Sequence, residues 1–247
     1  MTAFRGTFGA ARDAADSGIG NRLALFDCDG TLVDSGANIC LAMERAFDAN
    51  ALVPPPRAEI HRIVGLSLVE AVAVLHPDAD DSLNIRLAQS YRDAFVAMRG
   101  TPDFTHEPLY PGIAEVIVTL AEDGWMLGVA TGKSDRGLAI ILATHGLTDR
   151  FVTLQTADRH PSKPHPAMAL AAIAEAGASP ATTVMIGDTS FDMMMAEAAG
   201  AHAVGVDWGY HDAHELRDAG AAHVVSDAAA LIPALLACVG EPSISAP

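Results

Sequence analysis

The chain is poor in cysteine, in aromatic residues and in positive charge. Its 247 residues include three cysteines, and because the count is odd and no Cys-x-x-Cys pair occurs, a disulfide framework is not indicated. The 31 Asp and Glu residues outnumber the 15 Lys and Arg residues, which gives a formal net charge of −16. Because an acidic surface repels nucleic acid and anionic membranes, we expect neither as a partner.

Long hydrophobic runs are also missing, although 50% of the residues are hydrophobic. No uninterrupted apolar stretch approaches the ~20 residues that a membrane-spanning helix needs. The first twenty residues lack the apolar core of a signal peptide. Together with the cysteine usage, these absences predict a cytoplasmic protein. Residues 1–20 and 240–247 are expected to be loosely ordered ends.

Short apolar runs alternate with amphipathic stretches over most of the chain. We expect strands at 22–26, 125–130, 152–155, 183–186, 203–206 and 223–225. Helices are expected at 112–123, 134–145, 164–176, 190–199, 214–220 and 227–238. Since strands and helices alternate in this way in doubly wound folds, the sequence predicts an α/β protein with a parallel sheet.

One long stretch interrupts this alternation. Residues 36–107 contain no convincing strand and predict helices at 36–52, 66–75 and 82–98, the first of which is stopped by three consecutive prolines at 54–56. We therefore expect a core of residues 20–35 and 108–238 with an inserted, all-helical domain at 36–107. Because the insert follows the first acidic loop, it would lie above the carboxyl ends of the strands, where such sheets bind ligands, and could act as a lid.

Polar side chains follow several of the predicted strands at the point where each strand ends. Since the carboxyl ends of parallel strands meet at one edge, we expect these side chains to gather there. Several carboxylates this close cannot all stay ionised without a cation, and Mg²⁺ prefers oxygen ligands of this kind. A metal would also attract a phosphate group, which the acidic chain otherwise repels. The expected cluster comprises Asp27, Asp29, Thr131, Lys163, Asp188 and Asp192.

The cluster contains the groups that phosphoryl transfer requires. An Asp within reach of phosphorus acts as a nucleophile and forms an aspartyl-phosphate. A second Asp two residues further on lies on the same face of an extended strand end, where it protonates the leaving group and then activates water. A hydroxyl and an ammonium group stabilise the charge on the phosphoryl oxygens.

Four short motifs resemble those of the haloacid dehalogenase-like hydrolase superfamily. Residues 27–31 (Asp-Cys-Asp-Gly-Thr) are similar to its first motif, Thr131 to its second, residues 163–164 (Lys-Pro) to its third and residues 187–192 (Gly-Asp-Thr-x-x-Asp) to its fourth. They occur in the family's order, and the resemblance covers about residues 22–236. The ordered set is far more specific than any single motif.

Further details resemble members of the phosphoglycolate phosphatase type. These are residues 110–112 (Tyr-Pro-Gly), residues 163–166 (Lys-Pro-x-Pro) and residues 206–210 (Val-x-Trp-Gly-Tyr). The helical insert is similar to the C1-type cap of that subfamily. The resemblance therefore implies a core of the family's Rossmann-like fold with a cap inserted after the first motif.

The resemblance also implies a role for each acidic side chain and for the lysine. Asp27 would be the nucleophile and a ligand of Mg²⁺, and Asp29 would be the general acid and base, with its backbone carbonyl also on the metal. Asp188 would bind Mg²⁺ directly, and Asp192 would bind it directly or through water. Lys163 would stabilise the phosphoryl charge and orient Asp27.

Substrate contacts are implied in the same way. The Thr131 hydroxyl and the Gly132 amide would hold the phosphoryl group. Gly132 is a departure from the family pattern, because many relatives have Asn at this position, and one contact to the substrate or the cap is therefore in question. Within the cap, Arg62 and the loop at Gly65 are the candidates for substrate selection.

The predicted activity is Mg²⁺-dependent hydrolysis of a small phosphomonoester, with 2-phosphoglycolate as the first guess, by a monomer or a homodimer. A phosphomutase, a pyrophosphatase and a nucleotidase of the same fold remain open, and so does a non-catalytic phosphate-binding module. A dehalogenase is disfavoured, because Asp29 and Asp188 indicate phosphoryl chemistry.

Overall fold

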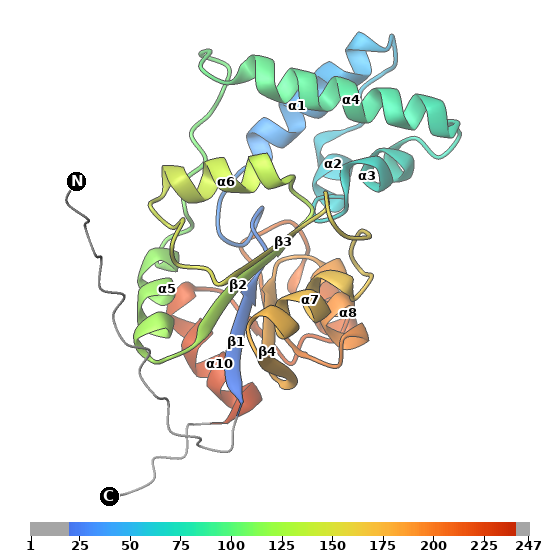
Figure 1. Ribbon diagram of the computed structural model, residues 1–247. Coiled ribbons are helices and arrows are strands. Elements are labelled where there is room, and N and C mark those ends of the chain that lie inside the picture. The colour runs from blue at the N-terminus through green and yellow to red at the C-terminus, as the bar shows by residue number, and fades with distance from the viewer. Residues whose placement is uncertain (1–19, 241–247) are drawn as a thin grey trace, which may run out of the picture.

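The computed structural model describes residues 20–240 (Figure 1). We predicted loosely ordered ends and no signal peptide at the start of the chain. Both predictions concern residues that lie outside the described range, except at positions 20 and 240. Among residues 20–240, no helix combines the length and the hydrophobicity that crossing a bilayer requires.

A parallel sheet of six strands forms the centre of the molecule, in the order β3-β2-β1-β4-β5-β6. The chain starts in the middle, builds outward to β3 and then returns to add β4 beside β1, so the strand order reverses between β1 and β4. The predicted α/β doubly wound fold is confirmed. The strands are β1 (Asn21–Phe26), β2 (Met126–Thr131), β3 (Thr153–Thr156), β4 (Ala178–Gly187), β5 (His202–Val206) and β6 (His223–Val225).

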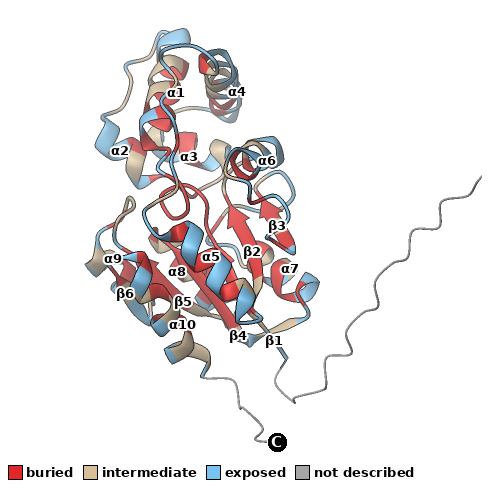
Figure 2. Ribbon diagram, turned by 90° about the vertical axis from the view of Figure 1, so that its left-hand side faces the viewer, coloured by how far each residue is buried: buried red, intermediate tan, exposed pale blue. Residues whose placement is uncertain are grey.

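Helices cover both faces of the sheet, which is therefore buried (Figure 2). Side chains alternate along β1: Leu23 and Leu25 pack into the cluster with α7 and α8, whereas Ala24 and Phe26 pack into the cluster with α5, α6 and α10. Because both faces are covered, β1 is hydrophobic throughout its buried part. The helices are α5 (Ile113–Glu122), α6 (Asp135–Thr144), α7 (Ala167–Glu175), α8 (Ser190–Ala198), α9 (Ala213–Asp218) and α10 (Leu231–Val239).

Four helices between β1 and α5 form what we call the helical segment, which lies over the carboxyl ends of the strands (Figure 1). They are α1 (Gly36–Ala49), α2 (Arg57–Arg62), α3 (Leu68–Leu75) and α4 (Asp81–Met98). The segment has a hydrophobic cluster of its own, to which α1 contributes Ile39, Met43 and Phe47 and α4 contributes Leu87. A spacing of four residues places these α1 side chains on one helix face.

We predict that Leu87→Ala lowers the free energy of unfolding by about 2–5 kcal/mol, because it opens a cavity at a fully buried position of the helical segment. Ile85→Ala is the matched control on the same helix, since Ile85 is 58% exposed, and we expect it to change the same free energy by less than about 0.5 kcal/mol. Urea titration followed by circular dichroism measures both. Equal effects of the two substitutions would contradict the packing described here.

Candidate active site

Two neighbouring strands place the two acidic motifs side by side. Asp27 directly follows β1, and its backbone N–H donates to the carbonyl oxygen of Ile186 in β4 at 2.8 Å. Asp188 directly follows β4. Since the strand order reverses between β1 and β4, the loops that follow them diverge and leave a crevice at this edge. Thr131, the last residue of β2, ends at the same edge.

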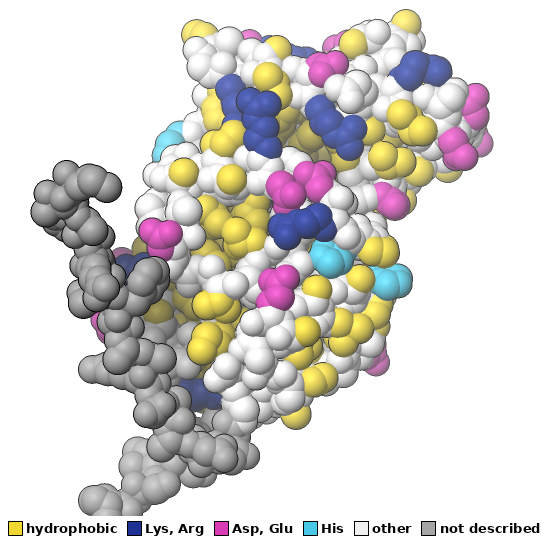
Figure 3. All heavy atoms as spheres, in the orientation of Figure 1, with side chains coloured by type: hydrophobic (Ala, Val, Ile, Leu, Met, Phe, Trp, Pro, Cys, Tyr) yellow, Lys and Arg dark blue, Asp and Glu magenta, His cyan; other side chains and the backbone are white. Residues whose placement is uncertain are grey.

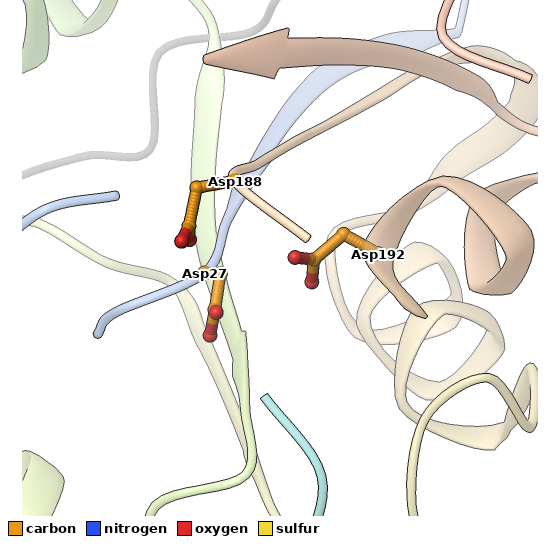
Figure 4. Close-up of side chains that lie close together, drawn as sticks. All are labelled: Asp27, Asp188 and Asp192. Atoms are coloured by element: carbon orange, nitrogen blue, oxygen red, sulfur yellow. The ribbon is translucent and has the colours of Figure 1, made fainter. Parts of the chain in front are cut away.

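Three carboxylates meet in this crevice (Figure 4). Asp27, Asp188 and Asp192 each offer an oxygen within 4.8 Å of the others, and none of the three residues is more than 1% exposed. Asp192 comes from the first turn of α8, and its carboxylate points toward the other two (Figure 4). We call these three residues the acid cluster.

Lys163 is the cation that the described residues supply to the acid cluster. Its side chain is fully buried, and Nζ lies 2.9 Å from Oδ1 of Asp27 and 2.6 Å from Oδ1 of Asp192. Burial by itself would lower the pKa of Lys163, but Asp192 and Asp27 together raise it above its usual value. The lysine is therefore charged and holds the nucleophile candidate against the start of α8.

One ammonium group does not compensate three carboxylates. Burial raises the pKa of Asp27 to about 7; Lys163 opposes this increase, and repulsion from Asp192 adds to it. Burial, followed by repulsion from Asp27 and Asp192, also raises the pKa of Asp188 well above its usual value. Neither Asp27 oxygen accepts a hydrogen bond of good geometry from residues 20–240. A divalent cation with oxygen ligands would satisfy these groups, so the acid cluster fits Mg²⁺.

The Asp188 side chain is held from two sides. Its Oδ1 accepts from the Thr31 hydroxyl at 2.8 Å, and its Oδ2 accepts from the Tyr210 amide at 2.9 Å. Gly30 has a φ of +85°, and a Cβ at this position would lie 2.2 Å from Oδ2 of Asp188. The glycine of the first motif is thus required both for its backbone conformation and for the close approach of the metal-binding candidate.

Asp29 lies apart from the acid cluster. Its Oδ1 is 2.8 Å from Nζ of Lys133 and accepts from the Ser35 hydroxyl at 2.5 Å. Sequence reasoning missed both partners. No local pattern distinguishes Lys133 from a solvated lysine. The one signal that could have identified it was its position two residues after Thr131, at the same strand end.

A cavity of about 520 Å³ lies between the helical segment and the core, and both Asp27 and Asp29 line it. Thr131, Gly132 and Gly65 line it as well, so the structure brings these sequence-predicted residues together. Arg62 is not among the lining residues: its side chain is 58% exposed and pairs with Glu215 at 2.6 Å.

The helical segment docks on the core through the loop between α2 and α3. A Cβ at Gly132 would lie 2.4 Å from the carbonyl oxygen of Leu66 and 2.8 Å from that of Gly65. Nearby, the Ser67 amide donates to the Ser162 hydroxyl at 2.8 Å. The absence of a side chain at position 132 therefore permits a backbone-to-backbone contact between this loop and the strand end that carries Thr131.

This architecture is that of a Rossmann-like α/β enzyme with an aspartate, a buried lysine and an acid cluster at the carboxyl ends of its strands. The family model for haloacid dehalogenase-like hydrolases matches residues 24–206. The chain therefore belongs to this family, and within it to the phosphatases.

Curated relatives and solved structures agree with this assignment. A "Probable phosphatase IndB" of Dickeya dadantii is 35% identical over 80% of this chain and 86% of the relative. A "Phosphoglycolate phosphatase" of Agrobacterium fabrum is 32% identical over 86% of this chain and 91% of the relative. The crystal structure of a hydrolase from Pseudomonas syringae superimposes with a TM-score of 0.77 at 29% identity, covering 87% of this chain and 98% of that one.

We predict that Gly132→Ala lowers the phosphatase kcat/KM by about tenfold to a hundredfold. The added Cβ would meet backbone atoms that cannot rotate away, so the loop and the groups it positions must move by a fraction of an ångström or more. Rates on p-nitrophenyl phosphate measure the effect. Gly20→Ala is the control, since a Cβ there meets nothing within 4 Å. Unchanged rates in Gly132→Ala would show that the docked loop is not needed.

Proposed function

We propose that this chain hydrolyses a small phosphomonoester with the help of Mg²⁺, through an aspartyl-phosphate on Asp27. The observation that carries the proposal is the acid cluster itself: a buried aspartate, oriented by Lys163 at 2.9 Å, faces a cavity and lies beside two further buried carboxylates. On the sequence evidence, 2-phosphoglycolate is the first substrate to test.

Mg²⁺ would be held by Asp27, Asp188, the backbone carbonyl of Asp29, and Asp192 directly or through water. When bound, it supplies positive charge to the phosphoryl oxygens and lowers the repulsion between the carboxylates. Lys163 adds a fixed positive charge next to the attacking carboxylate.

In the first chemical step, a carboxylate oxygen of Asp27 attacks phosphorus while the bond to the leaving oxygen breaks. Asp29 donates a proton to that oxygen, so the alcohol leaves neutral. The Thr131 hydroxyl and the Gly132 amide hold the phosphoryl oxygens, and both residues line the cavity. In the second step Asp29 takes a proton from water, which attacks the aspartyl-phosphate and releases inorganic phosphate with Asp27 regenerated.

We further propose that residues 36–107 form a cap domain over a core of residues 20–35 and 108–238. Its own hydrophobic cluster and its position over the cavity support this division. Arg62 would act on the docked loop without touching the substrate, because its carbonyl oxygen lies 3.1 Å from Nε2 of His211 and its side chain pairs with Glu215. The loop at Gly65 remains the part of the cap placed to contact a substrate.

Asp27→Asn tests the nucleophile. We expect the phosphatase rate to fall by a factor on the order of 10³ or more, while circular dichroism and the thermal midpoint remain those of a folded protein. Asp149→Asn is the control, because Asp149 is exposed and lies outside the cavity lining. A rate within a few-fold of the wild type in Asp27→Asn would refute the assignment, and no turnover by the wild-type chain on any phosphate ester would favour the non-catalytic binding module.

Removing divalent cations tests the metal. We expect EDTA to abolish hydrolysis of p-nitrophenyl phosphate and Mg²⁺ to restore it. Because the cation binds the folded state, Mg²⁺ at 100 times its Kd should also stabilise the protein by about 2.7 kcal/mol, which a denaturant titration measures without any substrate. Asp188→Asn should remove this stabilisation. Full activity after exhaustive chelation would exclude the metal from the mechanism.

A further inference from the structure

The wall of the cavity that belongs to the helical segment is hydrophobic. Ile39 and Met43 from α1 and Tyr91, Phe95 and Val96 from α4 all line it. Val96 is 53% exposed, whereas Leu87 on the same helix is packed in the buried cluster of the helical segment. Such a wall offers hydrophobic contact to whatever enters the cavity, and little to a phosphate group.

The size of the cavity also favours a substrate with a hydrophobic part. Its volume of about 520 Å³ falls in the range of about 300–1,000 Å³ that is usual for sites holding drug-sized ligands. This is the volume with the helical segment docked, since the loop at Leu66 already touches Gly132. The alcohol part of 2-phosphoglycolate has two carbon atoms. Its carboxylate would stay near Asp29 and Lys133 at the floor and leave the hydrophobic wall without contact.

Three arginines line the same cavity: Arg92 from α4, Arg99 directly after α4, and Arg136 from α6. Among residues 20–240, none of the three has a carboxylate within ion-pair distance. The Nε atom of Arg99 is buried without a hydrogen-bond partner within that range. Its guanidinium carbon lies 5.5 Å from the ring centroid of Phe95 and 6.0 Å from that of Phe104, which holds the group in place.

These basic side chains are notable in a chain whose net charge is −16. Figure 3 shows Lys and Arg side chains both above and below the hollow between the helical segment and the sheet, with hydrophobic and acidic side chains between them. Two carboxylates, Glu70 and Asp158, also line the cavity; Asp158 accepts a hydrogen bond from the Asp135 amide at 2.9 Å. Guanidinium groups bind carboxylates and phosphates with paired hydrogen bonds, so they define an anion site.

We propose that the natural substrate is a phosphomonoester whose alcohol carries a ring-sized hydrophobic body and a second anionic group. The phosphate lies at Asp27, the body packs against Phe95 and its neighbours on α1 and α4, and the second anion is bound by Arg92, Arg99 and Arg136. This inference rests on the proposed phosphatase activity and specifies its substrate class. It makes the helical segment the part that recognises both the body and the distal charge.

The test compares four esters of alkyl alcohols, so that leaving-group chemistry stays similar: ethyl phosphate, 2-phosphoglycolate, benzyl phosphate and 4-carboxybenzyl phosphate. We expect kcat/KM to rise about tenfold or more from ethyl to benzyl phosphate, because the ring is buried against the wall. A further rise of about tenfold is expected from benzyl to 4-carboxybenzyl phosphate, because a charged hydrogen-bonded pair forms.

Substitution of the arginines separates recognition from folding. The ratio of kcat/KM for 4-carboxybenzyl over benzyl phosphate is measured within one protein preparation, so the fraction of folded enzyme cancels. We expect this ratio to fall toward one in each of the single variants Arg99→Gln and Arg136→Gln. The same is expected of a variant that combines both substitutions with Arg92→Gln. Arg86→Gln is the matched control on α4, since Arg86 is exposed and does not line the cavity, and it should keep the wild-type ratio.

Each result has a distinct meaning. If 2-phosphoglycolate is the best of the four esters, the proposed substrate class is wrong while the phosphatase activity stands. Equal kcat/KM for the two benzyl esters, or an unchanged ratio in the arginine variants, would overturn the anion site. If the protein hydrolyses neither p-nitrophenyl phosphate nor any of the four esters in the presence of Mg²⁺, the proposed function itself is wrong.

Discussion

The contact of buried Lys163 with the acid cluster is the constraint on which the rest of the site depends. Its Nζ touches both Asp27 and Asp192 at full burial, and without it three buried carboxylates would meet with no cation from residues 20–240 beside them. Several parts of the fold serve this contact. The reversal of strand order places β1 beside β4, and a capping box at Thr189 fixes the first turn of α8, from which Asp192 projects.

The core and the helical segment contribute different kinds of side chain to the cavity. The strand ends of the core hold the charged side chains of the proposed mechanism, and every strand is paired within the buried sheet. The helical segment contributes the hydrophobic wall and two of the arginines of the same cavity. Where this segment docks on the core, the carbonyl oxygen of Leu66 occupies the space that a side chain at Gly132 would fill.

Most of the fold was predictable because buried parallel strands appear as hydrophobic runs, and all six predicted strands are present. Strand β4 begins at Ala178, not at residue 183. Its first five residues lack a hydrophobic run, are at least partly exposed, and join the sheet only by pairing with Asn21 across an irregularity. The short helix α2 was not separated from its neighbours, since six residues carry too little periodicity.

The order of the elements and the residues at each strand end follow from the sequence alone, because a strand end and the polar residue after it are neighbours in the chain. That is why Asp27, Thr131 and Asp188 could be named. The three-dimensional packing was needed to show that Lys133 pairs with Asp29 and that Arg62 pairs with Glu215 and does not line the cavity. These contacts join residues far apart in the chain, and no local pattern encodes them. The first depends on how the loops after the neighbouring strands β1 and β2 lie beside each other, and the second on how the helical segment sits on the core.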